Sequence, residues 1–135
     1  MKTGDLSIEK YKWKVRLYLA VTDYYIDDIL ESLASIYCPH KIMRRAAEKM
    51  AARRLDTGFT YSNERLRQSV MVVGLTSSPA EFLDSFEHEL RHLVDDIAKA
   101  DGLQLAGEDV AYLTGDTNRT LWPIVHNFIC CKCHE

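Results

Sequence analysis

Residues 78–100 read SPAEFLDSFEHELRHLVDDIAKA, and this stretch decides the fold because both of its ends carry helix signals. Ser78 and Glu81 have the spacing of a capping box, in which the Ser78 hydroxyl accepts from the Glu81 amide and the Glu81 carboxylate accepts from the Ser78 amide. Pro79 suits the first helical position, where no amide donor is needed. The sequence therefore predicts a helix that begins at Pro79.

The apolar residues of this segment define the side of the helix that faces the core. At about 100° per residue they fall on one broad stripe centred near Leu90, made of Phe82, Leu83, Phe86, Leu90, Leu93, Val94 and Ile97. Gly102 favours a helix end, so the helix is expected to stop at about Ala100. His88 and His92 lie on the opposite side, which leaves them available to a cleft.

The segments on either side predict an α+β fold. Residues 1–10 read as a polar lead, and the period-two alternation of residues 13–21 is typical of a strand with one buried face. Further elements are expected as helices at about 24–37 and 41–55, an antiparallel pair of strands at 59–61 and 69–75, a short helix at 108–113 that ends at Gly115, and a last helix at about 122–129. We expect one domain, residues 1–135, in which a short antiparallel or mixed sheet packs on the helix of residues 79–100 and on further helices.

Composition excludes several classes of protein. The chain has 135 residues, 47% hydrophobic and 27% charged, with a net charge of -3. It has no run of eighteen apolar residues and no secretory signal at its start, so we expect neither a membrane span nor export. Basic residues cluster only at 41–54, and no nucleic-acid partner is expected. The cysteines are expected to be reduced, and they suit a metal better than a disulfide framework.

The motif His88-Glu89-Leu90-Arg91-His92 carries the chemistry. Residues four apart lie one turn above each other on a helix, so His88 and His92 can direct two imidazole nitrogens at one tetrahedral zinc ion. Glu89 projects beside the ion, where its carboxylate can take a proton from a zinc-bound water and pass it to a leaving amine. The motif therefore predicts a zinc site.

A catalytic zinc site also needs a third protein ligand and an open position for water. Glu108 lies sixteen residues after His92, at the start of the next expected helix, and Asp109 is the alternative ligand. Asp95 suits a supporting position behind a histidine. Tyr112, one turn after Glu108, can donate a hydrogen bond to a tetrahedral intermediate or simply pack.

Residues 78–115, with H-E-L-R-H followed by G-E-D-V-A-Y-L, resemble the zincin metallopeptidases of the glutamate-zincin type. They are similar in particular to small HExxH proteins of bacteriophages and bacteria. The resemblance implies a zincin-like fold with His88, His92 and Glu108 as zinc ligands and Glu89 as general base. It also implies a peptide or protein substrate, bound by strand addition at an edge strand (for which we expect 69–75), and a place in the bacterial cytoplasm or the virion. Arg91 departs from the family, which usually has an uncharged residue there.

Two other segments are candidates for binding. Cys130 and Cys133 have C-x-x-C spacing and, with Cys38 and His40, could form a second, structural metal site. The basic segment 41–54 is a solvated helix face or a surface that binds an acidic protein partner. Two functions remain open at this point: a zinc-dependent peptide hydrolase, and a catalytically silent zincin-fold virion or assembly protein.

Overall fold

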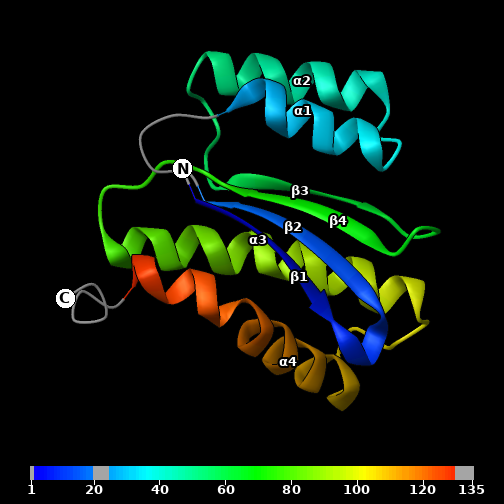
Figure 1. Cartoon of the computed structure of the whole chain (residues 1–135). Coiled ribbons are helices and arrows are strands. Elements are labelled where there is room, and N and C mark those ends of the chain that lie inside the picture. The colour runs from blue at the N-terminus through cyan, green and yellow to red at the C-terminus, as the bar shows by residue number, and fades with distance from the viewer. Residues whose placement is uncertain (1, 20–24, 130–135) are drawn as a thin grey trace.

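The computed structural model describes residues 2–19 and 25–129. In chain order its elements are β1 (Lys2–Ile8), the 3-10 helix η1 (Glu9–Tyr11), β2 (Trp13–Leu19), α1 (Ile26–Ser35), α2 (His40–Ala51), β3 (Gly58–Asn63), β4 (Gln68–Val73), α3 (Pro79–Ala100), α4 (Glu108–Val125) and the 3-10 helix η2 (His126–Phe128). The expected α+β class is confirmed, with a mixed sheet between two helical layers (Figure 1). No helix within these residues is long and apolar enough to cross a membrane.

The strand order is β1-β2-β4-β3, so β1 and β3 form the two edges of the sheet. β1 and β2 are antiparallel, β2 and β4 are parallel, and β3 and β4 form the expected antiparallel pair. The expectation that residues 69–75 form an edge strand is wrong. β4 pairs on both sides, because β2 occupies the side that a two-stranded hairpin would leave open.

Two helical layers cover the sheet because successive side chains point to opposite faces and β2 and β4 carry buried apolar residues on both. Trp13, Val15 and Leu17 of β2 pack with α3 and α4, whereas Tyr18 packs with α1 and α2. Both layers are visible in Figure 1, with α3 and α4 on one side of the sheet and α1 and α2 on the other. The two cores are therefore separated by the sheet itself.

The helix expected from Pro79 to Ala100 is confirmed as α3. The Ser78 hydroxyl accepts from the Glu81 amide at 3.1 Å, as predicted. The return contact differs, because the Glu81 carboxylate accepts from the hydroxyl of Ser77 at 2.7 Å and not from the Ser78 amide. At the other end Gly102 has φ 67, a left-handed conformation in which its amide and that of the next residue bond back to the last turn.

Two sequence predictions about elements are wrong. Residues 2–8, expected as a polar lead, form β1. Gly4 lies on the inward side of this strand, where the side chain of Ile124 fills the space that a Cβ would need. The two short helices expected around Gly115 and Trp122-Pro123 are one helix, α4. Its buried positions, Val110, Leu113, Thr117, Leu121 and Val125, keep helical spacing across Gly115 and hold the segment together.

Candidate metal site at the edge of the sheet

A pocket of about 310 Å³ lies where α3 passes the edge strand β3. α3 supplies its histidines and carboxylates, α2 supplies one lysine, and the connection into β3 supplies the rest. The lining residues are Lys49, Leu55, Asp56, Thr57, Gly58, Phe59, Thr60, His88, Glu89, His92 and Asp96. The HExxH motif therefore faces a hollow at a sheet edge, and not the α3–α4 interface.

His88 and His92 are exposed on α3, as the helical stripe predicts, and their ring centroids are 5.0 Å apart. A tetrahedral zinc ion with Zn–N bonds of about 2.1 Å places two imidazole centroids about 5 Å apart. Neither imidazole makes a hydrogen bond within the described residues. In donor type and separation, the pair fits two positions of a zinc site.

Glu89 is 1% exposed, and both of its carboxylate oxygens accept hydrogen bonds. The Thr57 hydroxyl donates to one oxygen at 2.7 Å and the Thr60 hydroxyl donates to the other at 3.0 Å. A buried carboxylate requires such donors, because removing it from water without them is costly. The two threonines therefore hold Glu89 in the wall of the pocket, turned toward β3.

Asp96, which the sequence offers as a competing ligand beside Asp95 and Asp109, lines the pocket one turn after His92. Its carboxylate accepts from the Ser62 hydroxyl at 2.7 Å. Ser62 in turn contacts Ser69 at 2.6 Å, and Ser69 accepts from the indole of Trp13. Partial burial raises the pKa of Asp96 above its usual value, and the Ser62 hydrogen bond and nearby His92 act in the opposite direction. A polar chain thus links the pocket to the core.

The backbone beside the histidines is fixed by a close contact at the start of β3. Gly58 has φ 137, and a Cβ at this position would lie 1.9 Å from the carbonyl oxygen of Val72. Only glycine fits such an approach without moving the neighbouring strand. The position of the pocket wall is therefore set by the pairing of β3 with β4.

The predicted third ligands lie elsewhere. Glu108 and Asp109 are exposed in the first turn of α4, which packs against α3 and β1, whereas the pocket adjoins β3 at the other edge of the sheet. Within residues 2–19 and 25–129, no set of three His, Cys, Asp or Glu side chains is arranged to hold a metal ion. Tyr112 is also on α4, 66% exposed. Of the site residues predicted at the motif and on the following helix, the described chain thus brings His88, Glu89 and His92 together in the pocket, which Asp96 also lines.

Asp95, expected behind a histidine, is occupied differently. Its carboxylate accepts from the Arg91 guanidinium at 2.8 Å, an i,i+4 ion pair on the outside of α3. Arg91 is therefore accommodated at the surface, as the helical stripe predicts. The carboxylate in the pocket beside His92 is that of Asp96.

The residues of the possible second metal site are only partly described. Cys38 is a buried free thiol in the core under α1 and α2, and burial raises its pKa to about 11. His40 is exposed at the first position of α2. Cys130 and Cys133 lie outside the described residues, so the four-ligand site stays a prediction.

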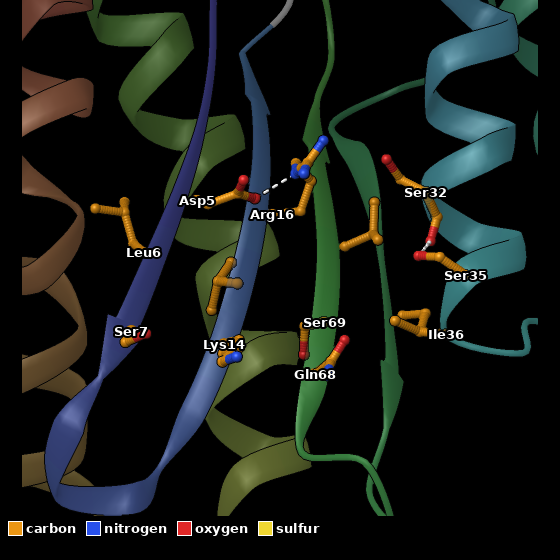
Figure 2. Close-up of a pocket in the computed structure, with 12 residues that line it drawn as sticks. Asp5, Leu6, Ser7, Lys14, Arg16, Ser32, Ser35, Ile36, Gln68 and Ser69 are labelled. Atoms are coloured by element: carbon orange, nitrogen blue, oxygen red, sulfur yellow. Dashed lines mark hydrogen bonds and ion pairs between the residues drawn. The ribbon is translucent and has the colours of Figure 1, made fainter.

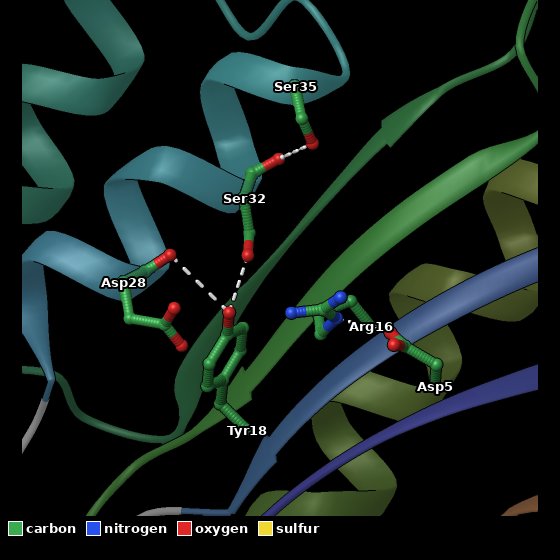
Figure 3. Close-up of polar contacts among 6 residues, drawn as sticks. All are labelled: Asp5, Arg16, Tyr18, Asp28, Ser32 and Ser35. Atoms are coloured by element: carbon green, nitrogen blue, oxygen red, sulfur yellow. Dashed lines mark hydrogen bonds and ion pairs between the residues drawn. The ribbon is translucent and has the colours of Figure 1, made fainter.

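A second hollow, of about 400 Å³, lies on the other side of the sheet, between α1 and strands β1, β2 and β4 (Figure 2). Its polar groups bond to one another. Arg16 pairs with Asp5, and the Tyr18 hydroxyl lies 2.5 Å from that of Ser32 (Figure 3). Ser35 donates to the carbonyl of Ser32 at 2.6 Å. The Tyr18 contact fastens α1 to β2, whereas the Arg16–Asp5 pair joins β2 to β1.

The residues of the metal pocket differ in how far sequence could reveal them. The histidines follow from a local motif, and Asp96, four residues after His92, was recognisable from sequence as a competing ligand. Thr57 and Thr60 lie about thirty residues before the Glu89 that they bind, and no local pattern marks them. The arrangement offers two exposed imidazoles and a buried carboxylate beside the edge strand β3.

Comparison with known proteins gives no match: no protein-family model, no curated protein and no solved structure is similar to this chain at a significant level. The functional argument therefore depends on the pocket.

Proposed function

We propose that this chain is a zinc-dependent hydrolase of the metallopeptidase type, with His88 and His92 as zinc ligands and Glu89 as general base. The observation that carries the proposal is the 5.0 Å separation of the two imidazole rings in a pocket whose wall contains Glu89. Bound zinc would polarise a peptide carbonyl and lower the pKa of its water ligand. Two histidines alone make an incomplete set, and Glu108, the third ligand that the resemblance to zincins implies, lies on α4 outside the pocket.

The residues of the chain have distinct roles in this proposal. Thr57 and Thr60 orient the carboxylate of Glu89 by donating to both of its oxygens. Glu89 would take a proton from the attacking water and deliver it to the leaving amine. Edge strand β3, with an unpaired side next to the histidines, would bind an extended peptide by strand addition.

A second candidate is a catalytically silent protein of the same type that serves in assembly or in a virion. The observation in its favour is the 1% exposure of Glu89, whose two oxygens are already occupied by threonine hydroxyls. A general base must reach a substrate proton within about 3 Å, directly or through one water. In the silent protein Glu89 would only stabilise the pocket. Both candidates would act in a bacterial cell or with its virion, as the resemblance implies.

The first test is zinc content, measured by mass spectrometry after metal removal and reconstitution. We expect one zinc per wild-type chain and loss of that zinc in His88→Ala and His92→Ala. His126→Ala is the matched control, because the His126 ring lies against Trp122, with centroids 5.5 Å apart, and is outside the pocket. A wild-type chain that takes up no zinc overturns the proposal.

The second test separates the two candidates. Glu89→Gln keeps the shape of the side chain and removes its basicity. If the wild type cleaves a fluorogenic peptide library and zinc-loaded Glu89→Gln does not, the hydrolase is supported. A fully zinc-loaded wild type without activity favours the silent protein.

A further inference from the structure

The helix α2 and the turn after it carry a concentrated positive charge. Residues 41–56 contain six basic and two acidic residues, whereas the rest of the chain contains eleven basic and eighteen acidic residues. The basic residues are all exposed: Lys41, Arg44, Arg45, Lys49, Arg53 and Arg54. We call these six residues the basic surface. It is a positive region on a chain that is otherwise acidic.

The geometry of α2 places part of this charge in a line. Ala46 and Met50 are buried against α1 and the sheet, so the cations occupy the outward side. Lys41, Arg45 and Lys49 are spaced by four residues and therefore share one side of the helix. α2 has 12 residues and a length of about 18 Å, which an extended peptide of about six residues spans.

This line of charge ends at the metal pocket. Lys49 lines the pocket that contains His88 and His92. Lys49 also lines an adjoining hollow of about 880 Å³, together with Arg53 and Arg54. Leu55 and Asp56, like Lys49, line both hollows. The end of the basic surface formed by Lys49, Arg53 and Arg54 therefore adjoins the histidine pocket.

We propose that the basic surface of α2 binds an acidic segment of the peptide or protein substrate and so leads the adjacent part of that substrate to the histidine pocket. This inference rests on the proposed function and names its substrate class. Charge complementarity of this kind raises the rate of encounter and fixes the register of the bound chain. The acidic segment spans α2, and the residues that follow it meet Lys49 at the mouth of the pocket.

An acidic peptide fits this surface better than a nucleic acid does. A polyanion longer than α2 would also contact the remainder of the chain, which contains eighteen acidic and eleven basic residues and would repel it. Nucleic-acid binders usually combine a basic face with a domain that is basic overall, so that many phosphates are neutralised together, whereas this chain has a net charge of -3. A short acidic segment needs only the length of one helix.

The test measures binding in the absence of zinc, so that hydrolysis does not interfere. The probe is a fluorescein-labelled peptide of about eight residues rich in Glu and Asp, titrated with the full-length chain and followed by fluorescence anisotropy. Lys41→Glu/Arg45→Glu is expected to weaken binding about tenfold, because two attractions become repulsions. Lys10→Glu/Lys12→Glu, at the connection between β1 and β2, makes the same change in net charge and is expected to weaken it less than about twofold.

The outcomes decide between clear alternatives. Equal losses in the two variants, or no binding of the acidic probe, overturn the inference. A labelled single-stranded oligonucleotide that binds more tightly than the peptide and is lost in Lys41→Glu/Arg45→Glu overturns the choice of a peptide. Zinc content of this variant should equal that of the wild type. If zinc binding fails while the acidic probe still binds at α2, the proposed function fails and the docking surface stands.

Discussion

The two helical layers of this protein differ in how they are held. Among the described residues, eighteen buried hydrophobic residues form the cluster between the sheet and α3/α4, whereas ten form the cluster under α1/α2. α1 is also fastened by polar contacts, such as that of Tyr18 with Ser32 (Figure 3). The α3/α4 layer therefore has the larger apolar core, and we expect the layer with the smaller core, α1/α2, to adjust more readily.

The candidate site lies between these unequal layers. His88 and His92 belong to the long helix of the well-packed layer, while Lys49 belongs to the smaller one. Ligands on a well-packed helix keep their geometry, which a metal site requires. Basic groups on a more adjustable layer suit a substrate whose sequence varies. The comparison teaches that fixed and adaptable parts of a site can come from opposite faces of one sheet.

The largest expected effect is on the free energy of unfolding, when a buried leucine is shortened in each of the two layers. Leu93 in α3 and Leu33 in α1 are both 0% exposed, so leucine-to-alanine substitutions at the two positions form a matched pair. We expect Leu93→Ala to lower the free energy of unfolding by about 4–5 kcal/mol, because the sheet and α4 hold its surroundings in place and the cavity persists. Leu33→Ala should cost about 3 kcal/mol, because the thinner layer can partly collapse.

Urea denaturation of both variants measures this difference. An equal loss at the two positions, or a larger loss at Leu33, would break the comparison between the layers.

A smaller effect is expected at the carboxylate that joins the pocket to β3. Thr60→Val removes one of the two hydroxyls that hold Glu89, and we expect a loss of about 1.5–3 kcal/mol because hydrogen bonds to charged, buried groups are worth more than neutral ones. Thr120→Val is the matched control, since its hydroxyl donates only to the carbonyl of Asp116 within α4. Thermal unfolding should place the control within about 1 kcal/mol of the wild type. Indistinguishable variants would mean that the threonine contacts contribute little to stability.

Sequence predicted most of this fold because the signals were local. α3 was predicted to the residue, since a capping serine and a left-handed glycine mark its ends. β1 was missed because Gly4 stands where the period-two pattern needs an apolar residue, and the space is filled by Ile124 from α4. α4 was divided because Gly115 and Pro123 are helix breakers by propensity, and burial along one stripe overrides propensity.

The site was predictable only in part, for a related reason. The imidazole pair follows from the four-residue spacing on one helix. Strand order decides which strand lies at the edge and which hydroxyls bond to Glu89. Long-range pairing between strands, which no local pattern reveals, sets that order. Glu108 was proposed as the third ligand from its place at the start of the next expected helix and from the resemblance to zincins, but no spacing rule fixes how a following helix packs.

The smallest expected effect is a pH dependence in the α1/α2 layer. Burial raises the pKa of Cys38 from 9.0 to about 11, so the folded protein keeps this thiol protonated where the unfolded chain loses the proton. This contribution to stability is fully present below pH 9 and is lost as the pH rises through about 11. At about pH 9.5 the loss is below about 1 kcal/mol. Urea unfolding from pH 8 to 10.5 should therefore show a steeper decline for the wild type than for Cys38→Ala. Parallel curves would show that the Cys38 thiol loses its proton as readily in the folded protein as in the unfolded chain. The core under α1 and α2 would then be more open to water than its packing indicates.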